Sequence, residues 1–132
     1  MRAKRSGSAG GGGAPEALGR LLLSAMFVHG GWSAFKQPGR RASAAERLGL
    51  PKPELMVRAN GAAMVLGGGA MALGILPRAA ALGLIASLVP TTLAGHPFWT
   101  EDDEAARRQQ TIHFLKNVGL MGGLLLVAAR RR

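Results

Sequence analysis

Four long apolar segments, separated by short polar loops, take up most of the 132-residue chain. They cover residues 18–35, 55–76, 79–95 and 112–129. At a rise of about 1.5 Å per residue, helices of this length come close to the ~30 Å hydrocarbon thickness of a bilayer. The pattern therefore predicts an all-α protein, in the form of an antiparallel four-helix transmembrane bundle.

A soluble four-helix bundle is the alternative, and the mean hydropathy of only +0.16 favours it. A helix of a soluble bundle, however, needs a polar stripe that faces water. Residues 79–95 contain no charged side chain, and residues 118–129 contain no strongly polar one. The low mean hydropathy comes from basic tails, abundant glycine and one charged loop. The missing stripes favour lipid over water as the solvent of these helices.

The chain is expected to form a single membrane domain over residues 16–132, because four short spans leave no room for a second core. Residues 1–15 are basic and rich in glycine and serine, which predicts a disordered tail. The basic start followed by residues 21–28 is also compatible with a secretory signal peptide, although no small-x-small cleavage site precedes the first loop. In the loops, Ala42–Leu48 predicts a short surface helix, and Thr100 is expected to cap a fourth helix that begins at Glu101.

Composition removes several classes of function. The chain has no cysteine, which excludes a disulfide framework, a cysteine-ligated metal and a thiol redox centre on this chain. The formal net charge is +10, but the basic residues flank apolar spans and are not interleaved with aromatic ones. They therefore favour contact with anionic lipid headgroups over binding of nucleic acid. The sequence has no zinc-ligand spacing, no phosphate-binding loop and no nucleophile with an arranged base, so we expect no metal and no catalytic activity of the chain alone.

Antiparallel threading brings most of the polar residues near the spans to one end of the bundle. The ends of the first and third spans and the starts of the second and fourth meet there, and we call this side the polar end. The opposite end has a loop that is too short to build a site. The candidate ligand-binding residues at the polar end are Lys36, Arg58, Asn60, His96, Trp99, His113, Lys116 and Asn117.

Two interpretations of the charges at the polar end remain open. Arg58 and Lys116 lie about one turn inside the apolar zone, where a charge is costly. They either bind an anion or a polar headgroup such as a quinone, or they form an internal clamp with acids of residues 54 and 101–104. In the clamp, Asn60 and Asn117 hydrogen-bond across helices. Structural ion pairs are commoner than binding sites, which favours the clamp.

Two further patterns lie within the spans. His113 either exchanges protons near neutral pH or makes a hydrogen bond at the interface, and His29 with His113 is the one candidate pair for a haem, which is disfavoured because only His29 lies deep. Small residues at four-residue spacing predict close helix packing. These rows are Gly119 with Gly123, Ala79 with Gly83 and Ser87, and Ala59 with Ala63 and Gly67.

Four sequence segments together resemble one family. The segments RLLLSAMFVHGGWSAFKQPG, RANGAAMVLGGGAMALGILPRAAAL, VPTTLAGHPFW and HFLKNVGLMGGLLL are similar to those of the DoxX family of small bacterial membrane proteins, over roughly Gly19 to Ala128. The resemblance implies a four-helix transmembrane bundle in a bacterial cytoplasmic membrane. It also implies a link to redox work, since the family is similar to a subunit of thiosulfate–quinone oxidoreductases. The motif positions carried over are Arg20, Gly30, Lys36, Arg58, Asn60, Gly61, His96, Phe98, Trp99, Phe114, Lys116 and Asn117.

The functional expectation combines the crowded polar end with this resemblance. We expect a non-catalytic membrane subunit or scaffold for a quinone- or thiol-linked redox partner, with the lipid bilayer as its surroundings and a quinone as the one candidate cofactor. The alternative is a small carrier or enzyme that acts on an anionic or quinone-like ligand at the polar end. A homo-oligomer is left open. The tails and the turn at residue 78 carry as many basic residues as the two other loops, and Arg20 tips the count towards cytoplasmic termini.

Overall fold

The computed structural model describes residues 13–130, and within that range it is built from helices alone. Five α-helices and one 3-10 helix follow one another, which confirms the predicted all-α class. Their bounds are α1 Gly13–Lys36, α2 Gly39–Arg47, α3 Pro53–Leu73, α4 Pro77–Gly95, η1 Phe98–Thr100 and α5 Glu104–Ala129.

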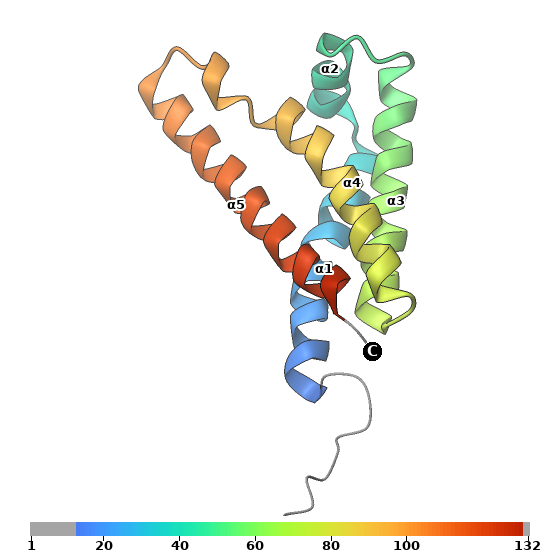
Figure 1. The fold of residues 1–132 in the computed structure, drawn as a ribbon. Helices are drawn as coiled ribbons and strands as arrows, with labels where there is room; N and C mark the ends of the chain where they lie inside the picture. Colours follow the sequence, from blue (N-terminus) through green and yellow to red (C-terminus); the bar gives the residue numbers. More distant parts are fainter. Residues whose placement is uncertain (1–12, 131–132) are drawn as a thin grey trace, which may run out of the picture.

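The four long helices run alternately up and down, and each packs on the next (Figure 1). Helix α1 lies along α3, α3 lies along α4, and α4 lies along α5. Helices α1 and α5 cross near the chain ends, and from there α5 diverges from α1 towards the polar end (Figure 1). The short helices α2 and η1 both lie at the polar end, as the antiparallel threading predicts.

The closest helix contact joins α1 to α3 through two glycines. A Cβ added at Gly31 would lie 2.6 Å from the carbonyl oxygen of Gly61, and a Cβ added at Gly61 would lie 2.6 Å from that of Gly31. Only hydrogen atoms therefore fit between the two backbones. Gly68, two turns after Gly61, lies against Phe27, which is one turn before Gly31. In lipid, the hydrophobic effect does not drive helices together. Small residues promote association instead, because they let the two backbones come close enough for van der Waals contact.

The predicted rows of small residues are only partly used for packing. Gly123 lies against Leu23 of α1, and Gly67 lies against Leu84 of α4. Gly119 and Gly83 have no neighbouring atom within 4 Å of an added Cβ, so the predicted contacts of these two glycines are wrong. Their spacing matches a packing motif, but their side of the helix points away from the neighbouring helices.

Most large apolar side chains outside a small core are exposed, which is the arrangement expected in lipid. The segments Pro77–Thr100 and Glu104–Ala129 are long and apolar enough to cross a membrane, yet only 22% and 17% of their most apolar windows are buried. The core helix of a soluble protein would be mostly buried. Helices α1 and α3, with 24 and 21 residues, have the length of a span, but neither contains an equally apolar window, because glycines and polar residues interrupt them. The core itself consists of Phe27, Met71, Ala81, Leu84, Leu88, Leu124 and Ala128.

Three predicted boundaries need correction. Helix α1 begins at Gly13, so the last three residues of the predicted disordered tail are helical, and residues 1–12 lie outside the described range. Helix α5 begins at Glu104 rather than at Glu101, because Asp103 is its N-cap and accepts a hydrogen bond from the backbone N–H of Ala106. The hydroxyl of Thr100 instead donates to the carbonyl of Pro97 in η1. The predicted surface helix is confirmed as α2, which starts three residues earlier than expected.

Candidate functional site

Asn60 connects α3 to α4 through two hydroxyl groups. The hydroxyl of Ser87 donates to Asn60 Oδ1 over 2.7 Å, and Asn60 Nδ2 donates to Thr91 Oγ1 over 3.3 Å. Ser87 and Thr91 are one helical turn apart, so both face α3. The Thr91 hydroxyl also donates to the carbonyl of Ser87 on its own helix. The polar atoms of Asn60 are thus used for helix association.

Asn117 connects α5 to α4 in the same way. It is 7% exposed, and its Nδ2 donates to Thr92 Oγ1 over 3.0 Å. The Thr92 hydroxyl in turn donates to the carbonyl of Leu88 on its own helix, over 2.6 Å. The sequence prediction that Asn60 and Asn117 bond across helices is confirmed for both residues.

A second polar contact joins α4 to α5 nearer the loop. Nδ1 of His96 lies 2.8 Å from Oε1 of Gln110, and because a carbonyl oxygen only accepts, the N–H of His96 donates. The rings of His96 and His113 stack, with centroids 5.1 Å apart. His113 is therefore held by another imidazole rather than by Asn117, whose helix face it shares.

Trp99 belongs to an aromatic cluster that packs η1 against the N-terminal half of α5. The rings of Phe98, Trp99 and Phe114 meet edge to face, with centroids 5.2 to 6.1 Å apart. Such edge-to-face pairs stabilise a contact beyond the area that they bury. Trp99 nevertheless stays more than half exposed, as is typical of an aromatic residue at a membrane interface.

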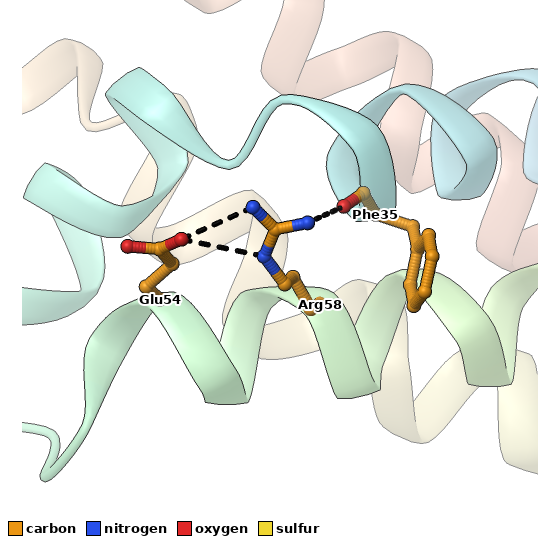
Figure 2. Close-up of polar contacts among 3 residues, drawn as sticks. All are labelled: Phe35, Glu54 and Arg58. Carbon is orange, nitrogen blue, oxygen red and sulfur yellow. Dashed lines mark hydrogen bonds and ion pairs between the residues drawn. The ribbon is translucent and has the colours of Figure 1, made fainter.

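Arg58 is held by its own helix and by the end of α1 (Figure 2). Its Nη2 lies 3.1 Å from Glu54 Oε1 and its Nη1 donates to the carbonyl of Phe35 over 2.7 Å. The last carbonyls of a helix have no partner within the helix, so this guanidinium caps the C-terminus of α1. The interaction corresponds to the predicted clamp, with Glu54 as the acid.

Lys116 does not take part in the clamp. It is exposed, and within residues 13–130 no acidic oxygen lies within 4 Å of its ammonium group. Helix α5 keeps Glu104 about 18 Å away along its axis, because twelve residues at about 1.5 Å each separate the two. The predicted pairing with Glu101–Glu104 is therefore wrong. Lys36 is also exposed, and its ammonium lies 5.7 Å from the ring centre of Trp32.

Seven of the eight candidate residues fall into two groups. The eighth, Asn60 of α3, lies between these groups and bonds to α4. Lys36 and Arg58 lie at the α1–α3 junction. The other five lie from the C-cap of α4 through η1 to α5, namely His96, Trp99, His113, Lys116 and Asn117. No contact joins Arg58 to Lys116. The sequence reasoning did not select Ser87, Thr91, Thr92 and Gln110, which supply the partner groups. The hydroxyls of Ser87, Thr91 and Thr92 inside an apolar helix mark them as candidates for hydrogen bonds across helices, but the sequence does not assign their partners.

The histidines and acidic residues bear on the haem and metal sites that the sequence brought into consideration. His29 is exposed on α1, while His113 stacks on His96, the C-cap residue of α4, so the imidazole pair that the structure forms is not the one considered for haem. In the part of the chain that the structure describes, no group of three or more His, Cys, Asp or Glu residues could hold a metal ion.

Comparison with known proteins identifies one family. The family model DoxX matches residues 16–97, which is more than half of the chain and covers α1 to α4 with few residues omitted. The motif residues on α5, including Lys116 and Asn117, lie outside this match. No curated protein and no solved structure matches the chain.

Proposed function

The chain belongs to the DoxX family and is a membrane protein, and on that premise we propose that it is a non-catalytic subunit that docks a redox partner at its polar end. The observation that carries this proposal is that the amides near the polar end are bonded within the protein, whereas two cations are not. The amides of Asn60 and Asn117 make hydrogen bonds to α4, while the cations Lys36 and Lys116 stay exposed. Buried groups that are satisfied within the protein stabilise the fold, whereas exposed cations attract a partner of opposite charge.

A second candidate function is supported by the position of Lys116. Lys116, Leu120, Gly123 and Val127 follow each other at helical spacing, so they share one face of α5. Gly123 on this face touches Leu23 of α1, which orients the whole face towards α1. Helix α5 diverges from α1 above that contact (Figure 1), and Lys116 lies two turns before Gly123 on the same face of α5. The exposed ammonium of Lys116 is then suited to an anionic or quinone-like ligand that reaches this face of α5 from the bilayer.

Charge-reversal variants distinguish the two proposed functions. The variant Lys36→Glu with Lys116→Glu is expected to lose about tenfold in retained partner, because both exposed cations become repulsive. The matched control is Arg108→Glu, an exposed cation nearer the start of α5, which should retain the partner within about twofold. The measurement is affinity purification in mild detergent, followed by mass spectrometry, absorbance spectra of flavin, haem and iron–sulfur groups, and quinone extraction.

Each outcome of that purification has a meaning. A stoichiometric protein that carries a redox group, and that the double variant loses, supports the subunit. An extracted quinone without a protein partner supports the second candidate and contradicts the first. Recovery of the bare chain under several mild conditions contradicts both.

We also propose that all four long helices cross a bacterial plasma membrane with both termini in the cytoplasm. Helices α1 and α3 have 24 and 21 residues, which span about 36 and 32 Å. Since the chain has no cysteine, a single introduced one is a unique label. In intact cells, a membrane-impermeant thiol reagent should label Ser43→Cys in α2 but not Ile75→Cys in the turn between α3 and α4. The reverse pattern would invert the topology.

A further inference from the structure

A charged cluster lies at the end of the bundle opposite to the polar end, where the sequence predicted no site. Glu16 of α1 contacts two guanidinium groups, those of Arg20 and Arg130. Arg20 also donates through Nε to the carbonyl of Met71 at the C-terminal end of α3, over 3.1 Å. Two positive charges thus share one carboxylate, so the cluster keeps a net positive charge and attracts an anion.

Arg20 is held in place before any ligand binds. Its Nη1 lies 3.8 Å from Glu16, its Nε is fixed on Met71, and its Nη2 lies beside Gly74, which has no side chain to displace it. The side chain of Arg20 is 20% exposed, so part of its guanidinium remains accessible. Arg78 is nearby in the fold, since its Nε donates to the carbonyl of Ala128 on the last turn of α5. A cationic group that is already oriented binds an anion with little loss of side-chain entropy.

An apolar groove adjoins this cluster between α1 and α5. It has a volume of about 410 Å³, with Glu16 and Arg20 at its charged end. The volume lies within the range of small-molecule sites. Apart from the two charged residues, hydrocarbon groups and glycines line the groove, so it has nothing to offer a fully polar solute such as free phosphate. Its apolar lining consists of Gly19, Leu22 and Leu23 of α1 and Gly123, Leu126 and Val127 of α5.

We propose that this groove binds one anionic phospholipid, with an acyl chain between α1 and α5 and the phosphate at Arg20 and Arg130. The charge of the cluster and the apolar lining match the two parts of such a molecule. Basic pockets between membrane helices on the cytoplasmic side are a recurrent way to bind anionic headgroups. The site needs α1 and α5 to lie in the bilayer, but it is independent of docking at the polar end. The lipid fills the α1–α5 junction, where the two helices themselves make little contact.

Native mass spectrometry with added lipids tests the proposal. The protein should retain one phosphatidylglycerol and favour it over phosphatidylcholine with the same acyl chains. Arg20→Gln and Arg130→Gln should each lower the retention about fivefold, and the double variant about 25-fold. Equal retention of both lipids, or no effect of the double variant, overturns the proposal. Displacement of the lipid by millimolar inorganic phosphate also overturns it, because the site would then recognise the anion alone.

A second variant tests the groove without touching the charges. A Cβ added at Gly19 meets no atom within 4 Å, so Gly19→Leu places its side chain in the groove without a backbone clash. It should lower the retention of phosphatidylglycerol at least fivefold. The matched control is Gly83→Leu on α4, where an added Cβ also meets nothing and which is not among the groove residues. Retention that is equal in the two leucine variants overturns the assignment of the groove to the acyl chain.

Discussion

Replacement of Gly31 by alanine is expected to force α1 away from α3 and to lower the stability of the protein by about 1–3 kcal/mol. The added methyl carbon would lie 2.6 Å from the carbonyl oxygen of Gly61 and 2.7 Å from the Cβ of Met64. Both atoms are attached directly to the α3 backbone, so no side-chain rotation relieves the overlap. Thermal unfolding in mild detergent, followed by size-exclusion chromatography with tryptophan fluorescence, measures the effect.

The neighbouring glycine is the control for Gly31. A Cβ at Gly30 would lie 3.7 Å from the terminal methyl group of Met64, which is an ordinary contact with a flexible side chain. Gly30→Ala should therefore leave the melting temperature unchanged or raise it slightly, because alanine favours a helix over glycine. Gly61→Ala should resemble Gly31→Ala, since the two positions share one contact. Equal melting temperatures for Gly31→Ala and Gly30→Ala would contradict the close α1–α3 packing.

Replacement of Asn117 by aspartate is the second change with a large expected effect. Asn117 is buried within α5, and its amide donates to Thr92. A carboxylate there loses the donor and places a charge in the apolar zone, which costs up to about 2.5–3.5 kcal/mol on insertion scales. Asn117→Leu removes only the hydrogen bond, which is worth about 0.6 kcal/mol on average between membrane helices. We expect Asn117→Asp to be recovered from membranes in much lower yield than Asn117→Leu.

The control is Gln109, an exposed residue of α5 at which the same change, from a side-chain amide to a carboxylate, can be made. Gln109→Glu adds a carboxylate near the start of the helix, where the helix dipole favours a negative charge. Its stability should stay within about 0.5 kcal/mol of that of the original protein. If Asn117→Asp were as stable and as well inserted as Gln109→Glu, then Asn117 would not lie in a dry helix interface.

The long helices and their polar end were predictable because lipid imposes simple rules on a sequence. A span must be long and apolar, and an amide within it must find a partner on another helix. Asn60 and Asn117 follow this rule. Their partners were not predictable, since Ser87 and Thr91 face α3 whereas Thr92 faces α5, and sequence spacing does not say which side of α4 meets which neighbour.

Contacts that depend on where two helices cross could not be predicted from the sequence. Gly31 and Gly61 meet because of the crossing point of α1 and α3, and neither stands in a predicted small-residue row. The ion pair of Glu16 and Arg130 joins the two ends of the described chain, so no local sequence pattern predicts it. By contrast, Arg58 and Glu54 are four residues apart on one helix, and this part of the clamp was predictable from spacing alone.

The central claim is that lipid surrounds these helices, because so much apolar surface on α4 and α5 is exposed in the folded chain. The most direct measurement is fractionation of expressing cells by high-speed centrifugation without detergent, followed by an alkaline carbonate wash of the pellet. We expect the protein to stay in the washed membrane pellet and to enter the supernatant only when detergent is added. A folded protein that remains in the supernatant without detergent would contradict the account.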